Sequence, residues 1–131
     1  MQQTKILNLT QHPATADQVA AGVRDFDGEA LETLKSLLTF NDLPTSDEGV
    51  ERAEKIAKLA KEFGYRAAMI GGAPYLMPAL ERALCEMGIR PLYAFSRRES
   101  VEKTLPGGEV VKTQVFKHLG FVEATTCDKA G

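Results

Sequence analysis

The chain has 131 residues, 44% of them hydrophobic and 26% charged, so it can build one core but not two independent domains. Its 16 basic and 18 acidic residues leave a net charge of −2, which excludes a generic DNA-binding surface but not a local site for a small anion. No apolar run approaches the ~20 residues of a membrane span, and Met1–Lys5 lead into the first strand-like segment without a signal stretch. We therefore expect a cytoplasmic protein.

The first half of the chain alternates strand-like and helix-like patterns. In chain order it predicts a buried strand, a short helix, a brief second strand and two longer helices over residues 4–9, 15–21, 23–26, 27–39 and 45–63. Gly22 and Gly64 follow two of the helices as stop signals, and Asp27 can cap the middle one. Thr45, followed three residues later by Glu48, is the pattern of a capping box.

The second half predicts two more strands, a helix and a hairpin. The strands cover residues 66–70 and 89–95, with a helix between them that starts after Gly71–Pro74 and ends at Met87. The polar run Ser96–Ser100 is expected to end the second of these strands as a loop. Residues 101–105 and 109–117 flank the turn Pro106–Gly108, which indicates an antiparallel β-hairpin. A short strand over 120–123 and a flexible tail over 124–131 complete the chain.

The order of these elements predicts the fold class. Strands that alternate with helices imply right-handed crossovers and a mostly parallel sheet, to which the C-terminal hairpin adds antiparallel strands. We expect one α/β domain over residues 1–123.

Three segments follow predicted strands and are polar or glycine-rich where the strand was apolar: Asn8–Pro13, Gly71–Pro74 and Ser96–Ser100. In open parallel sheets, ligands bind beyond the carboxyl ends of the strands. The three segments are therefore expected to lie together at one edge and to form the binding site.

Each segment has a functional and a structural interpretation. Gly71, Gly72 and Ala73 can offer backbone N–H groups to a phosphate or carboxylate, or can simply form a tight turn. Arg97 and Arg98, between Ser96 and Ser100, can bind phosphate, or can belong to a solvated loop in which Glu99 pairs with an arginine.

The first segment supplies a hydroxyl, an amide and an imidazole from Thr10, Gln11 and His12. His12 can act as a general acid near neutral pH, or it can only donate a hydrogen bond to a ligand. His118 is expected to be an ordinary residue of the hairpin. Cys85 and Cys127 lack the spacing of metal ligands, and Cys85 lies in a helical apolar pattern that favours a buried free thiol. We expect no metal and no cofactor.

The run Leu7–Pro13 resembles the start of small CRISPR-associated Rossmann-like (CARF-type) proteins, some of which are ring nucleases, and the chain also resembles small phage and bacterial proteins. The resemblance implies a three-layer Rossmann-like fold and a homodimer that binds a cyclic oligoadenylate across its two-fold axis. It also implies metal-independent cleavage by the ligand's own ribose 2′-hydroxyl, in a context of antiviral defence. Past Pro13 the sequence departs from that pattern.

On this sequence the resemblance implies a role for each candidate residue. His12 is the candidate general acid or base, and Ser96 with Arg97 or Arg98 would hold phosphate. The other expected contacts to the ligand come from Asn8, Thr10, Gln11, Gly71, Gly72, Ala73 and Ser100.

Three functions remain open at this stage. The first is a nucleotide-binding protein that acts as a metal-independent phosphodiesterase, and the second is a non-catalytic sensor or sponge with the same pocket. The third is a small interaction protein whose hairpin edge pairs with another subunit or partner.

Overall fold

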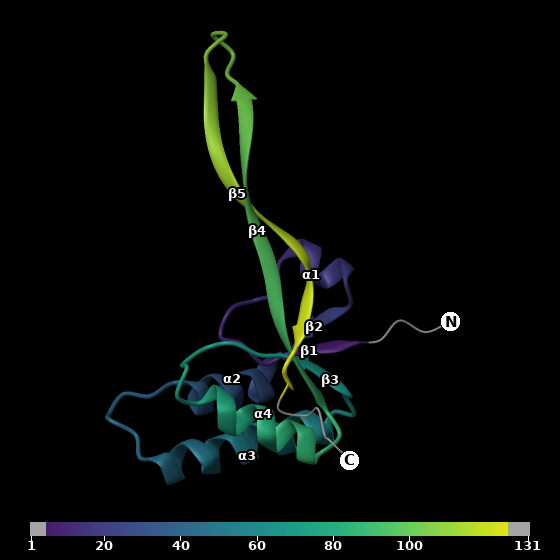
Figure 1. Ribbon diagram of the computed structural model, residues 1–131, viewed down its shortest axis with the longest axis vertical. Coiled ribbons are helices and arrows are strands. Elements are labelled where there is room, and N and C mark those ends of the chain that lie inside the picture. The colour runs from purple at the N-terminus through teal and green to yellow at the C-terminus, as the bar shows by residue number, and fades with distance from the viewer. Residues whose placement is uncertain (1–4, 126–131) are drawn as a thin grey trace.

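The computed structural model describes residues 5–125, which form a five-stranded sheet with helices on both faces (Figure 1). The elements follow in the order β1 (Ile6–Asn8), α1 (Ala16–Ala20), β2 (Val23–Asp25), α2 (Gly28–Leu38), α3 (Ser46–Glu62), β3 (Ala67–Met69), α4 (Met77–Glu86), β4 (Arg90–Thr104) and β5 (Val110–Glu123). This arrangement confirms the predicted α/β class with a mostly parallel sheet and a C-terminal antiparallel hairpin.

The strand order in the sheet is β2-β1-β3-β4-β5. β1 pairs in parallel with both β2 and β3, β3 pairs in parallel with β4, and β4 pairs antiparallel with β5. The chain thus moves outward in one direction from β1 to β2, then crosses to β3 and continues in the other direction. The strand order reverses between β1 and β3, and in doubly wound sheets this switch point is where ligands bind.

The core lies on both faces of the sheet because successive side chains of a strand point to opposite sides. Leu7, Leu9, Ala68 and Ile70 are buried against α2, α3 and α4, which cover one face. The other face carries a smaller buried cluster, Ile6, Val23, Ala67, Met69 and Leu92. Within residues 5–125 the five-residue helix α1 is the one helix over that second face, and none of its residues is buried, so its cover is thin.

Capping residues start two of the helices, whose beginnings the sequence predicts near residues 15 and 45. The Thr15 side chain accepts a hydrogen bond from the Gln18 backbone N–H at 3.2 Å, and the Gln18 side chain accepts one from the Thr15 backbone N–H at 3.0 Å. Thr45 likewise accepts from the Glu48 N–H at 3.1 Å. The predicted return bond from Glu48 is wrong, because the Glu48 carboxylate accepts from Arg52 at 2.9 Å instead.

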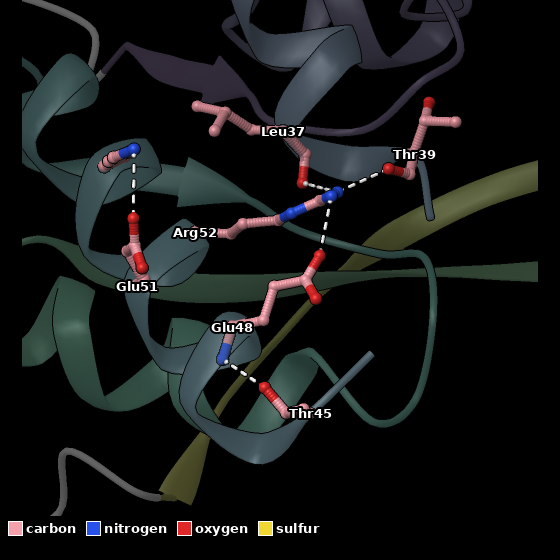
Figure 2. A network of polar contacts seen from close by, with 7 residues as sticks. Leu37, Thr39, Thr45, Glu48, Glu51 and Arg52 are labelled. Atoms are coloured by element: carbon pink, nitrogen blue, oxygen red, sulfur yellow. Dashed lines mark hydrogen bonds and ion pairs between the residues drawn. The ribbon is translucent and has the colours of Figure 1, made fainter. Parts of the chain in front are cut away.

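Arg52 of α3 joins the two long helices (Figure 2). Its guanidinium binds Glu48 one turn earlier and donates to the backbone carbonyls of Leu37 and Thr39 at the end of α2. It also lies 4.1 Å from the centroid of the Phe40 ring. The last carbonyls of a helix have no partner within the helix, so Arg52 supplies a donor to the Leu37 carbonyl at the end of α2 and joins α2 to α3.

The predicted strand end at Phe95 is wrong. β4 continues without a break from Arg90 to Thr104, and residues 96–104 pair with residues 110–118 of β5. The register shifts between Phe95 and Ser96, where Leu119 has no opposite residue, as in a β-bulge. Beyond this bulge the two strands leave the body of the protein together (Figure 1). We call residues 96–104 and 110–118 the arm.

Three further sequence expectations concern single features. Cys85 on α4 is half-buried and disulfide-bonded, so the expectation of a buried free thiol is wrong, and Cys127 lies outside the described residues. Within residues 5–125 no helix is long and apolar enough to cross a membrane. Ala124, the first residue of the predicted tail, is buried, and its N–H donates to the Pro91 carbonyl at 2.9 Å. Residues 126–131 of that tail lie outside the described range.

Replacing Arg52 tests the junction between α2 and α3. Arg52→Lys keeps the charge but loses the forked geometry that reaches Glu48 and two carbonyls, so we expect the free energy of unfolding to fall by about 1–2 kcal/mol. Lys55→Gln is the matched control, because Lys55 makes only an exposed pair with Glu51 on the same helix. That control should change stability by less than about 0.5 kcal/mol. Equal effects in urea denaturation would contradict the assigned role.

Candidate functional site

An open cavity of about 670 Å³ lies at the switch point between β1 and β3. It is bounded by the segments that follow these two strands, by the start of α1, by the end of α2 and by β4. Its lining residues are Thr10, Gln11, His12, Pro13, Thr15, Gln18, Leu38, Met69, Ile70, Gly71, Gly72, Ala73, Tyr93 and Ala94. Two of the three predicted segments therefore meet here.

The Asn8 side chain holds the first of these segments in place through hydrogen bonds. Its side chain is 3% exposed and donates to the Asp25 carboxylate at 2.8 Å and to the His12 carbonyl at 2.7 Å. Its Oδ1 accepts from the Thr10 backbone N–H at 2.9 Å and from the Thr10 hydroxyl at 2.7 Å. All the polar groups of the amide are thus used within the protein, and Asn8 positions the loop.

Asp25 is a residue that the sequence patterns did not single out. It ends β2 and lies beside Asn8 in the parallel register of β1 and β2. Its carboxylate also accepts from the Ala14 N–H at 3.1 Å, so it ties the entry of α1 to the same loop. The sequence does show a carboxylate near the end of the predicted strand 23–26. Assigning that carboxylate to the site requires knowing that this strand pairs with the first strand.

Gln11 and His12 form the outer part of the loop. The Gln11 amide donates to the Leu38 carbonyl at 3.1 Å and to the Thr39 hydroxyl at 3.3 Å, which joins the loop to the end of α2. The His12 imidazole is exposed and makes no hydrogen bond to any residue in the described range, while its backbone carbonyl accepts from Asn8. Of the predicted polar contacts in this loop, His12 has the side chain most available to a ligand.

The second segment, Gly71–Ala73, offers backbone donors. Within residues 5–125 the N–H groups of Gly71, Gly72 and Ala73 donate to no protein acceptor. Gly72 has φ +142°, a conformation that L side chains rarely adopt, and a Cβ on Gly71 would lie 3.6 Å from the Thr10 methyl group. These glycines thus let the two loops come close, and residues 71–73 contribute backbone to the cavity lining.

Tyr93 of β4 forms an aromatic part of the cavity lining. Its hydroxyl donates to the Glu81 carboxylate of α4 at 2.5 Å. Burial, together with the hydrogen bond and negative charge of Glu81, raises the pKa of the Tyr93 phenol above its usual range. The ring is partly buried against the core and contributes to the cavity lining. Sequence reasoning missed it because it lies within an apolar strand.

The structure does not bring the third predicted segment to the cavity. Ser96, Arg97, Arg98 and Ser100 lie in the arm, and none of them lines the cavity. Arg97 donates to the Glu99 carboxylate at 2.8 Å, and this hydrogen bond lowers the pKa of Glu99. Arg98 lies 5.4 Å from the centroid of the Phe116 ring across the hairpin. Both guanidinium groups therefore have partners within the arm, as the solvated-loop interpretation expected for Glu99.

The cavity lining combines apolar walls with neutral donors. Leu38, Met69, Ile70, Tyr93 and Ala94 supply the walls, and no lysine, arginine, aspartate or glutamate lines it among the described residues. Within residues 5–125 no three histidine, cysteine or acidic side chains lie close enough to hold a metal ion. The arrangement can stack a planar group against Tyr93 and hydrogen-bond a small anion through the Gly71–Ala73 backbone.

The fold and the cavity define a doubly wound α/β protein with a ligand-sized cavity at its switch point. The chain belongs to the MJ1673 family, a family described as uncharacterized, whose profile matches residues 4–122. No curated protein and no solved structure matches the chain. The resemblance of Leu7–Pro13 to CARF-type proteins stays a prediction.

Asn8→Asp tests the role of the buried amide. The new carboxylate would face the Asp25 carboxylate and the His12 carbonyl with no hydrogen to donate, so we expect a loss of about 2–4 kcal/mol at neutral pH. The repulsion raises the pKa of the carboxylate pair in the folded state, so the loss should shrink as the pH falls toward about 4.

Asn41→Asp, at an exposed position between α2 and α3, is the control for this exchange. It should change stability by less than about 0.5 kcal/mol at any pH. Thermal unfolding of both variants across the acidic range checks the prediction, and a pH-independent effect of Asn8→Asp would contradict it.

Proposed function

We propose that this protein binds a nucleotide in the cavity at the β1–β3 switch point. The observation that carries the proposal is the meeting of the Gly71–Ala73 backbone donors with the apolar, tyrosine-bearing lining in one cavity of about 670 Å³. Cavities of roughly 300–1,000 Å³ hold ligands of this size. The base would lie against Tyr93, and the phosphate would accept from the backbone donors.

The volume favours one nucleotide unit in each chain. A cyclic oligoadenylate contains several such units, so binding a ring would require the cavities of two chains to share it. We accordingly propose mononucleotide recognition as the elementary step, and we keep the homodimeric arrangement from the CARF-type resemblance as the route to a cyclic ligand.

Binding without cleavage is the favoured form of the proposal. A general acid or base is normally oriented by a second side chain, and the His12 imidazole has no such partner among residues 5–125. The arginines expected to stabilise developing charge lie on the arm. We therefore favour the non-catalytic sensor over the metal-independent ring nuclease. A cytoplasmic location stays a prediction from the sequence.

Thermal shift and calorimetry with adenosine monophosphate, adenosine and inorganic phosphate test the binding site. We expect the monophosphate to bind more tightly than either fragment and to stabilise the fold by about 2.7 kcal/mol when present at a hundredfold excess over Kd. Ala94→Phe, which places a large side chain in the cavity, should weaken binding about tenfold or more. Arg97→Ala combined with Arg98→Ala is the control and should leave affinity unchanged. Equal binding of the monophosphate by all three proteins would place the ligand elsewhere.

The catalytic alternative has its own test. Incubation of the protein with cyclic tetra-adenylate in the presence of a chelator, followed by chromatography, should show intact ligand if the protein only binds. Linear products that vanish in His12→Ala while binding persists would establish the ring-nuclease function instead.

A further inference from the structure

The arm, residues 96–104 and 110–118, is exposed over most of its length. Every side chain in it except Glu99 and His118 is exposed, and it extends away from the body of the protein (Figure 1). A two-stranded hairpin without a third strand or a helix packed on it is marginally stable in water. We therefore expect a partner surface to pack on the arm and stabilise it.

One face of the arm carries a compact apolar patch. Residues directly opposite one another in an antiparallel pair share a face, and the diagonal neighbours lie within reach. Val101 pairs with Thr113, and Val111 and Val115 lie two positions to either side of Thr113 on β5. These three valines are 43%, 40% and 43% exposed in that order. We call Val101, Val111 and Val115 the valine patch.

The charged residues beside the valine patch would meet opposite charges if two copies of this face packed together. On the same face Lys103 pairs with Val111, and Glu99 pairs with Val115, one row to either side of Val101 and Thr113. Consider a second arm stacked on this face and related by a two-fold axis that runs along the Val101–Thr113 row, across the strands and between the two ribbons. This axis would place Lys103 of one chain over Glu99 of the second chain, and the reverse. It would also place Val111 over Val115 and Val101 over its own copy.

We propose that the valine patch packs face to face against the valine patch of a second copy, with the two arms antiparallel. Stacked sheets lie about 10 Å apart, a spacing at which valine side chains from two ribbons interdigitate. The opposite face of the arm has Ser100 and Gln114 at the corresponding centre, and its exposed apolar residues, Val110 and Phe116, lie six residues apart on β5 instead of in one patch. The arm-to-arm contact is narrow compared with a standard interface, so the dimer forms in a concentration-dependent way.

Val101→Lys and its neighbour Ser100→Lys locate the contact face. Sedimentation equilibrium of the wild-type chain over a range of concentrations should show a reversible monomer–dimer equilibrium. Val101→Lys brings two lysines together on the axis and should raise the dissociation constant about tenfold or more, whereas Ser100→Lys lies on the other face and should leave it unchanged. Unchanged thermal unfolding of the body would show that both variants fold. A wild-type chain that stays monomeric, or a dimer weakened by Ser100→Lys but not by Val101→Lys, overturns the proposal.

A charge exchange tests the antiparallel geometry and the identity of the partner. Lys103→Glu and Glu99→Lys should each weaken self-association, because each homodimer then faces like charges at both ends of the patch. An equimolar mixture restores both opposite-charge contacts, so it should form a mixed dimer more tightly than either variant associates alone. A mixture that associates no better than its components excludes this packing and points to a partner other than a second copy.

Discussion

Leu7 and Asn8 of β1 pair in parallel with Ala68 and Met69 of β3 at the centre of the sheet, and this short contact determines where the other elements lie. Because the two strands are parallel neighbours, the loops that follow them leave the sheet at the same edge. Because the chain returns to β3 only after building β2, α2 and α3, the helices before and after β3 cover the same face. The cavity is the space that these two requirements leave between the loops.

The cavity is also joined to the helical layer by side-chain contacts. Gln11 in the first loop donates to the end of α2, and the same end accepts from Arg52 of α3. Asn8 and Asp25 tie that loop to β2 and to the entry of α1. The loop is thus hydrogen-bonded to the end of α2 through Gln11 and to β2 through Asn8. A site held in this way needs little rearrangement on binding, which favours affinity.

Much of the fold was predictable because its signals are local. The periodicity of apolar residues and the caps at Thr15 and Thr45 gave the helices within a few residues, and short apolar runs gave β1, β2 and β3. The parallel order also followed from the alternation of strands and helices. Two loops of the site were expected from the general position of ligands in such sheets.

The remaining features depend on contacts between distant segments. Ser96–Ser100 was expected to be a loop because its residues are polar, yet a ribbon with water on both faces needs no apolar alternation, and β5 supplies its backbone hydrogen bonds. The strand register places Asp25 beside Asn8, and the contact with α4 holds Tyr93 at the cavity; neither could be read from the local sequence. The disulfide at Cys85 left no signal in its helical surroundings.

The bulge at Leu119 separates two regions of unequal local stability. On the body side β1, β3 and the start of β4 are buried in the core, whereas on the arm side nearly every residue is exposed. Local opening costs least where burial is least, so amide hydrogens of the arm should exchange with solvent long before those of β1 and β3. The arm can therefore open and close as a unit of its own while the sheet around the cavity stays intact.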